Sequence, residues 1–337
     1  MNIKPLLLNL ARKALRRSSW SRCYLLSRCP PVIVSFWRNF YDNADDIFPT
    51  VAGAPEPHIL SSLFWHHETV ERADSLALEA RDLQTRFSNI NLLFLCNSNR
   101  ESNLLSERGL QAIFCHQNAF LDERIYPINP AIPKKFDAIY VARIDRIKRH
   151  YLAQKIESLQ LIGDTAPEEE DYYKETMRQL AHASWERYVP AVFMYKELNA
   201  ARVGLCLSAE EGAMYASAEY LLCGLPVVST KSLGGRDEFF DPEYVVIVED
   251  NPESVANGVR ELISRNIDPM HIRERTLAKM QPHRDKLLEV LTRICDKSGQ
   301  PAPRWSDFFT NKLGYGTRPG RKLFRERALQ KNWKLEG

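Results

Sequence analysis

The sequence predicts an α/β fold with two domains, and three observations lead to this prediction. The chain has 337 residues, a length that suggests about two domains of roughly 150 residues each. Short apolar runs without alternation recur between helical patterns, as in parallel sheets that helices cover on both faces. Pro127, Pro130 and Pro133 make a stiff stretch, which predicts a domain boundary there.

The first domain is expected over residues 31–133, after a basic amphipathic segment over 1–30. Apolar runs of strand length predict its strands at 32–37, 91–96 and 112–115. Helical patterns predict helices at 58–87 and 99–108, and a stretch rich in Asp, Pro, Ala and Gly predicts a loop at 41–57.

The second domain, expected over 134–295, is a doubly wound α/β domain in which strands and helices alternate regularly. Its strands are predicted at 136–142, 158–162, 191–195, 204–208, 226–229 and 244–248. Its helices are predicted at 147–156, 168–183, 196–201, 213–223, 252–265 and 269–294. Ligands of such sheets bind at the carboxyl ends of the strands, so residues that follow a strand are the site candidates.

The composition is that of an ordinary globular protein. Hydrophobic residues make up 44% of the chain and charged residues 26%, which excludes collagen-like, disulfide-rich and largely disordered classes. No run of about 18 apolar residues is present, so a membrane-spanning helix is not expected. The seven cysteines form no Cys-x-x-Cys pair, which indicates a reducing compartment and neither a zinc site nor a disulfide framework.

Positive charge gathers at both ends of the chain. Residues 1–41 hold eight basic residues and no acid, and residues 297–337 hold ten basic residues and three acids. A basic segment with interspersed leucines suits an anionic membrane surface. A solvated terminus, a transit peptide and a helix packed on its own domain are the alternatives. Nucleic acid is not expected as a partner, because no recognisable binding motif accompanies the charge.

Two cations follow the first strand of the second domain. Arg143 is expected at the strand end and Lys148 in the first turn of the next helix, both facing one crevice. A guanidinium and an ammonium there suit a diphosphate. The alternative is a solvated basic helix start, since Arg146 and Arg149 are neighbours.

Two carboxylates flank the start of another predicted helix. Gly212 permits a tight turn, and the helix start offers backbone N–H groups to an anion. Glu211 and Glu219 are eight residues apart, about 12 Å along a helix axis. A glycosidase pair needs its carboxyl groups within about 5–9.5 Å, so the spacing favours two separate hydroxyl-binding roles. The later Gly234-Gly235 pair lets the backbone approach a ligand closely.

These residues resemble the motifs of retaining glycosyltransferases of the GT4 family, which have the GT-B fold of two Rossmann-like domains. The stretch Ser208-x-x-Glu211-Gly212-x6-Glu219-x4-Gly224-x-Pro226 is similar to the family's E-x7-E segment. Other features match in the family's order; they are Asn118, the Arg143-x4-Lys148 pair, Ile162-Gly163-Asp164, and Gly234-Gly235 with Glu238.

The resemblance implies a role for each matched residue. Arg143 and Lys148 would neutralise the diphosphate leaving group, and Glu211 would hold the donor sugar. Glu219 would bind the ribose hydroxyls. Backbone N–H groups of Gly212, Ala213 and Met214 would lie near sugar and phosphate, beside the Gly234-Gly235 loop. The family needs no metal, and no Asp-x-Asp motif follows a strand here.

The chain departs from the family pattern mainly in its first domain. That domain is shorter than usual and has no Gly-rich loop after its first strand, and Tyr220 stands where a small residue is common. His66 or His67 is a weak match to the family's acceptor-side histidine, and packed or surface histidines are the alternative. The segment 296–337 is expected to cross back to the first domain, through 305–313 and 321–329.

Three functions remain open at this stage. The first is a metal-independent hexosyltransferase that moves a sugar from a nucleotide-diphosphate-sugar to a glycan or lipid-linked acceptor in polysaccharide biosynthesis. It would be cytoplasmic and peripheral on the inner membrane face, and would need no cofactor. The second is a non-catalytic binding or scaffold protein on the same fold. The third is a nucleotide-sugar epimerase, which would convert a sugar without an acceptor.

Overall fold

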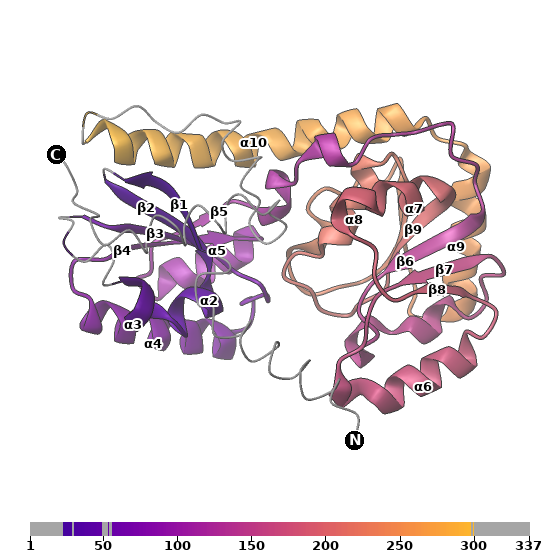
Figure 1. The fold of residues 1–337 in the computed structure, drawn as a ribbon, viewed down its shortest axis with the longest axis horizontal. Coiled ribbons are helices and arrows are strands. Elements are labelled where there is room, and N and C mark those ends of the chain that lie inside the picture. Colours follow the sequence, from indigo (N-terminus) through magenta and orange to yellow (C-terminus); the bar gives the residue numbers. More distant parts are fainter. Residues whose placement is uncertain (1–22, 29, 49–52, 54–55, 298, 300–337) are drawn as a thin grey trace, which may run out of the picture. The chain divides into compact units, whose positions relative to one another are not determined.

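The computed structural model describes residues 23–28, 30–48, 53, 56–297 and 299 (Figure 1). The chain forms two compact units. Unit 1 comprises the described residues up to Phe64, Thr69–Phe114 and the described residues from Lys286 onward, and unit 2 comprises Trp65–Glu68 and Cys115–Asp285. Most of the predicted basic segments, residues 1–22 and 300–337, lies outside the described residues, as do the predicted return segments 305–313 and 321–329.

The units divide after Phe114, whereas the prolines predict a boundary at 133. The stretch between the two positions bonds to unit 2. Asn118 Nδ2 donates to the Met214 carbonyl at 2.8 Å, and the Asn129 N–H donates to Asn199 Oδ1 at 2.8 Å. The prolines therefore stiffen a segment that already belongs to unit 2.

Unit 1 has a five-stranded sheet whose spatial order follows the chain. The strands are β1 (Cys23–Arg28), β2 (Pro31–Phe36), β3 (His58–Ser62), β4 (Asn91–Cys96) and β5 (Ala112–Phe114). Strand β1 is antiparallel to β2, and all other neighbours are parallel. The register aligns Ile33 with Ile59 and Ile59 with Leu92, which places these apolar side chains on one face.

Helices cover that face of the unit 1 sheet. They are α2 (Trp37–Tyr41), α3 (Ala44–Ile47), α4 (Val70–Arg86) and α5 (Asn99–Glu107). One core of buried residues joins them to the sheet, with Ile33, Ile59 and Phe94 from strands and Leu83 and Leu105 from helices. Burial of such side chains stabilises by about 1.5–3 kcal/mol each.

Three predictions for unit 1 were wrong. The helix expected over 58–87 begins only after Thr69, whose hydroxyl accepts from the Arg72 N–H at 3.3 Å. The first five residues of that range instead form β3, because they pair with β2 on one side and β4 on the other. The loop expected over 41–57 contains α3, and the end of the segment 1–30 forms β1.

Unit 2 has a six-stranded sheet in which all neighbouring strands are parallel. The strands are β6 (Phe136–Val141), β7 (Leu159–Ile162), β8 (Ser184–Glu186), β9 (Ala201–Cys206), β10 (Val227–Thr230) and β11 (Val245–Val248). Their spatial order is β11-β10-β9-β6-β7-β8. The chain builds outward from β6 on one side and then from β9 on the other, so the strand order reverses between β6 and β9. A crevice at the carboxyl ends of strands forms at such a switch point.

The helices of unit 2 are α6 (Glu170–Gln179), α7 (Met194–Ala200), α8 (Tyr215–Leu222), α9 (Pro252–Arg265) and most of α10 (Pro269–Asp296). The helix expected over 147–156 is two 3₁₀ turns, Arg146–Lys148 and His150–Ala153, because Arg149 between them adopts a left-handed φ of 52°. The strand expected at 191–195 is a 3₁₀ turn leading into α7, and β8 was missed.

Helix α10 runs through both units, which divide between Asp285 and Lys286. Pro282 lies inside the helix shortly before that division.

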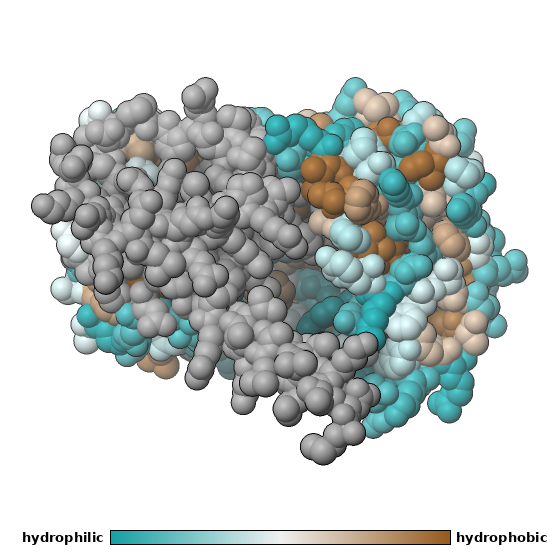
Figure 2. Space-filling model, viewed as in Figure 1, coloured by the Kyte–Doolittle hydropathy of each residue, from teal (hydrophilic) through white to brown (hydrophobic). Residues whose placement is uncertain are grey.

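In the described part of the chain, no helix is both long and apolar enough to cross a membrane. On the visible face of unit 2, hydrophobic residues gather in patches bordered by hydrophilic ones (Figure 2).

Candidate functional site

Lys148 and Glu211 meet at the switch point of unit 2. Lys148 follows β6 and Glu211 follows β9, and the two strands are neighbours in the sheet. The Lys148 ammonium forms an ion pair with Glu211 Oε1, and the Ser208 hydroxyl donates to the same oxygen at 2.7 Å. Both charged side chains are about nine-tenths buried, at 10% and 9% exposure. Mutual pairing is what allows two charges to remain buried.

Arg143 also lies at the end of β6, but its side chain is 57% exposed. Its guanidinium bonds to Asp145 Oδ2 at 3.1 Å. Such an exposed pair is worth little, about 0–1 kcal/mol, so the guanidinium is available to an incoming anion. Arg143 and Lys148 both follow β6, as the sequence predicted, and Lys148 is the more buried of the two. That both cations face one crevice stays a prediction.

Glu211 precedes the helix that contains Glu219, as the sequence predicted, although the helix begins two residues later than expected. Helix α8 begins at Tyr215, four residues after Glu211, and contains Glu219 in its buried face. Glu219 is 4% exposed, and its Oε1 accepts a hydrogen bond from the Tyr126 hydroxyl at 2.6 Å. The segment from Gly212 to Met214 therefore forms the turn between the Glu211 position and the helix start.

Gly234 is required by a close approach between two backbone segments. Its φ is +103°, and a Cβ added there would lie 1.8 Å from the Glu211 carbonyl oxygen. The Glu211 N–H donates to the Leu233 carbonyl at 2.9 Å, and the Leu233 N–H donates to the Ala209 carbonyl at 2.8 Å. The glycine pair thus lets the loop approach the Glu211 backbone, where the sequence predicted an approach to a ligand.

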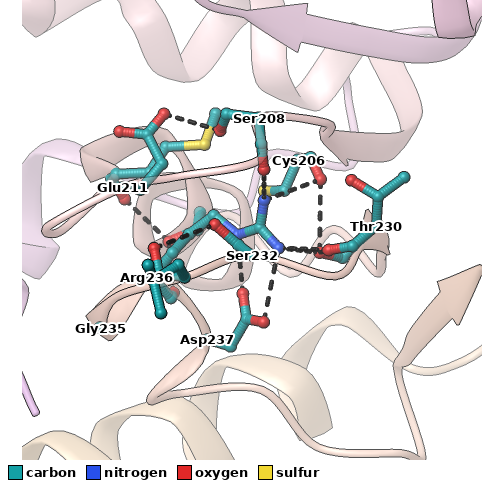
Figure 3. Close-up of polar contacts among 12 residues, drawn as sticks. Cys206, Ser208, Glu211, Thr230, Ser232, Gly235, Arg236 and Asp237 are labelled. Carbon is teal, nitrogen blue, oxygen red and sulfur yellow. Dashed lines mark hydrogen bonds and ion pairs between the residues drawn. The ribbon is translucent and has the colours of Figure 1, made fainter. Parts of the chain in front are cut away.

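Arg236 holds together the strand ends that carry the site (Figure 3). Its side chain is fully buried. The guanidinium donates to the carbonyls of Cys206, Ser208 and Thr230 and to the Ser229 hydroxyl, and pairs with Asp237 at 2.7 Å. Burial opposes the charge, but the Asp237 carboxylate outweighs it and the pKa of Arg236 is raised. Sequence reasoning missed this residue.

His116 anchors the glycine loop from another segment of unit 2. Its Nδ1 accepts from the Asn118 N–H at 3.1 Å, so Nε2 carries the proton and donates to the Gly235 carbonyl at 2.8 Å. Burial lowers the pKa of His116 to about 3, so the ring is neutral. Asn118 bonds to the Met214 carbonyl at the start of α8. The sequence singled out Asn118 but not His116.

His66 lies beside the same loop, in the short segment Trp65–Glu68 of unit 2. Its ring is buried, and Nε2 is 3.1 Å from Glu210 Oε2. A Cβ on Gly234 would be 3.0 Å from the His66 Cβ. His67 is half-buried. Of the two histidines, His66 is therefore the one that these contacts place next to the Glu211 region.

Within the described residues, no three or more His, Cys, Asp or Glu side chains are grouped so that they could hold a metal ion. The five cysteines with described side chains are buried and form no disulfide; they are Cys96, Cys115, Cys206, Cys223 and Cys295.

A parallel six-stranded sheet with a switch point between β6 and β9 defines the class of Rossmann-like domains. Within this class, residues 135–265 match the family described as "Glycosyl transferases group 1". The matched range spans every strand of the unit 2 sheet. No curated protein sequence matches the chain.

Solved structures resemble the chain over both units. HepE from Anabaena, in complex with UDP, is 16% identical, with 78% of each chain covered and a TM-score of 0.60. Sucrose-phosphate synthase from Thermosynechococcus elongatus is 14% identical, with 86% of this chain and 77% of the other covered and a TM-score of 0.54. The pneumococcal O-GlcNAc transferase GtfA is 12% identical, with 78% of this chain and 55% of the other covered and a TM-score of 0.53.

These likenesses establish the fold, which has two Rossmann-like units of the GT-B type as the sequence predicted. The family match together with this fold supports a glycosyltransferase.

Proposed function

We propose that the chain transfers a hexose from a nucleotide-diphosphate-sugar to a glycan or lipid-linked acceptor, with retention of configuration and without a metal. The observation that carries this proposal is the buried cluster of Lys148, Ser208 and Glu211 at the switch point of unit 2. The solved relatives add support, since structures of HepE hold UDP, UDP with glucose, and UDP-glucose.

In this proposal the cations act on the leaving group. As the bond between sugar and phosphate breaks, negative charge builds on the departing diphosphate. Lys148 is held in place by Glu211, which also accepts a hydrogen bond from Ser208, and Arg143 is exposed at the end of the same strand. Fixed positive charge stabilises this developing charge more than it stabilises the bound donor, which accelerates the step.

The remaining groups bind the donor. Glu211 would accept hydrogen bonds from the sugar hydroxyls, and Glu219 from the ribose. The turn over residues 212–214 precedes α8, whose first N–H groups and positive dipole end favour an anion. The Gly234-Gly235 loop, fixed by Arg236 and His116, would close the sugar side.

A hydrolysis screen over UDP-, GDP- and ADP-sugars tests the proposal. We expect one donor to be cleaved or transferred, and Lys148→Ala to lower that rate by about 100-fold or more. Lys174→Ala, a lysine with 65% side-chain exposure on α6, is the matched control and should leave the rate unchanged. If no donor is cleaved and none raises the melting temperature, the proposal fails. A sugar epimer formed without transfer would indicate the epimerase instead.

The membrane part of the proposal needs its own test. Because Cys23–Arg28 form a strand of unit 1, deletion is confined to residues 1–22, which hold six basic residues. Each basic residue near an anionic surface is worth about 1 kcal/mol. We expect the deleted protein to co-sediment less with vesicles of phosphatidylglycerol and phosphatidylcholine than the full chain does. Equal co-sedimentation would remove the membrane-bound location from the proposal.

A further inference from the structure

Tyr126 contacts the carboxylate that the proposed function assigns to the ribose. Its hydroxyl donates to Glu219 Oε1 at 2.6 Å, and both side chains are buried. This length is typical of an O–H donor bonded to a charged carboxylate, which is roughly twice as strong as a neutral hydrogen bond. The two residues are 93 positions apart in the chain, so no local structure explains their contact.

The backbone around Tyr126 is fixed to the end of the helix that carries Glu219. The guanidinium of Arg273 donates to the carbonyls of Tyr126 and Glu123 and also to that of Leu222, the last residue of α8. On the other side, Asn199 Nδ2 donates to the Pro127 carbonyl at 2.9 Å. Tyr126 is therefore held from several directions, and its hydroxyl has a defined position relative to α8.

We propose that Tyr126 is a positioning residue that orients the Glu219 carboxylate for the ribose hydroxyls and thereby contributes to selection of a ribonucleotide donor. This inference rests on the proposed function, because it needs a nucleotide at the switch point. A glutamate side chain has several rotatable bonds, and a carboxylate fixed in advance loses less conformational entropy when it binds. Carboxylate oxygens accept hydrogen bonds, and the 2′- and 3′-hydroxyls can donate them.

The inference predicts a loss that depends on the ribose hydroxyls. Calorimetric titration with UDP and with its 2′,3′-dideoxy analogue, and with the matching guanosine pair, would compare the chain with Tyr126→Phe. We expect the variant to bind the natural diphosphate about tenfold more weakly and the dideoxy analogue within about twofold of the unchanged chain. Tyr188→Phe, which removes a hydroxyl from a side chain in a residue 76% exposed, is the matched control and should change neither affinity.

A second variant distinguishes positioning from a general effect on folding. In a Glu219→Ala background, Tyr126→Phe should weaken natural diphosphate binding by less than about twofold, because the side chain that Tyr126 orients is already gone. The ratio of the affinities for the natural and the dideoxy diphosphate does not depend on how much of the protein is folded. The folded fraction itself is given by the binding stoichiometry. Equal weakening for both ligands, or a further tenfold loss in the Glu219→Ala background, would overturn the inference. Absence of binding of every diphosphate to the unchanged chain would overturn the proposed function itself.

Discussion

Replacement of Arg236 by methionine tests how the site is held together. Methionine fills a similar volume but donates no hydrogen bond. In the folded chain, the Arg236 guanidinium serves four buried oxygens at the ends of β9 and β10, in addition to Asp237. In the variant the Ser229 hydroxyl can still donate to the Cys206 carbonyl at 3.3 Å or to the Thr230 carbonyl at 3.0 Å. Two of the three carbonyls therefore lose their side-chain donor, and the partly exposed Asp237 turns to water.

The expected loss follows from the number of acceptors. A buried polar group left without a partner costs about 1–3 kcal/mol, and two carbonyls in the middle of that range give about 4 kcal/mol. This agrees with the roughly 3–5 kcal/mol lost when one partner of a buried charged network is removed. A typical unfolding free energy is about 5–15 kcal/mol, so unit 2 is expected to remain folded but weakened.

Amide hydrogen exchange measures this change with an internal reference. Peptides from β9 and β10 should exchange roughly 1,000-fold faster in Arg236→Met, while β3 and β4 of unit 1 keep their protection. Arg260→Met, at an arginine with 62% side-chain exposure on α9, is the matched control. Protection of β9 and β10 within tenfold of the unchanged chain would show that the two carbonyls find other donors, and the reasoning would be refuted.

Two further predictions concern backbone geometry and pH. Gly234→Ala should lower the free energy of unfolding by about 3–5 kcal/mol, since it adds a clash with the Glu211 backbone to the strain of a left-handed φ. The control Gly109→Ala has a φ of +79° but open space around the added Cβ, so it should cost only about 1–2 kcal/mol. Equal losses for the two variants in urea unfolding would contradict this prediction. Burial lowers the pKa of His116 and of His150 from 6.5 to about 3, so the unfolded chain binds more protons in that window. Unit 2 should therefore lose about 1.4 kcal/mol per histidine for each pH unit below 6.5 and none above it, and flat stability between pH 7 and pH 5 by hydrogen exchange would oppose the assignment.

The sequence carried enough information to predict the fold class and the positions of Lys148 and Glu211 after strands of one parallel sheet, but not the ion pair between them. Each residue follows an apolar run, and parallel strands end at the same edge of a sheet. That argument needs only strand order and local pattern. The prediction for 58–62 failed because the same five residues suit a helix in isolation, whereas pairing with β2 and β4 on both sides selects the strand.

The contacts that fix the site were not predictable from local pattern. His116 bonds to Gly235 across 119 positions, and Arg236 reaches back 30 positions to the Cys206 carbonyl. Single histidines and arginines in loops resemble solvated residues in sequence, and only the folded chain shows that they are buried. The Gly234-Gly235 pair was a usable signal, because two glycines indicate that the backbone approaches another group closely. The sequence did not show that this group is the Glu211 backbone.

Unit 1 is discontinuous in sequence, with its last portion beginning at Lys286, whereas unit 2 is complete at Asp285. During synthesis on the ribosome, domains generally fold as their residues emerge. The five strands of unit 1 are made first, yet the half of α10 assigned to that unit arrives only after all of unit 2. The nascent chain therefore has to protect an incomplete unit 1 from aggregation until the part of α10 after Asp285 has been synthesised, which makes expression yield sensitive to truncation within that helix.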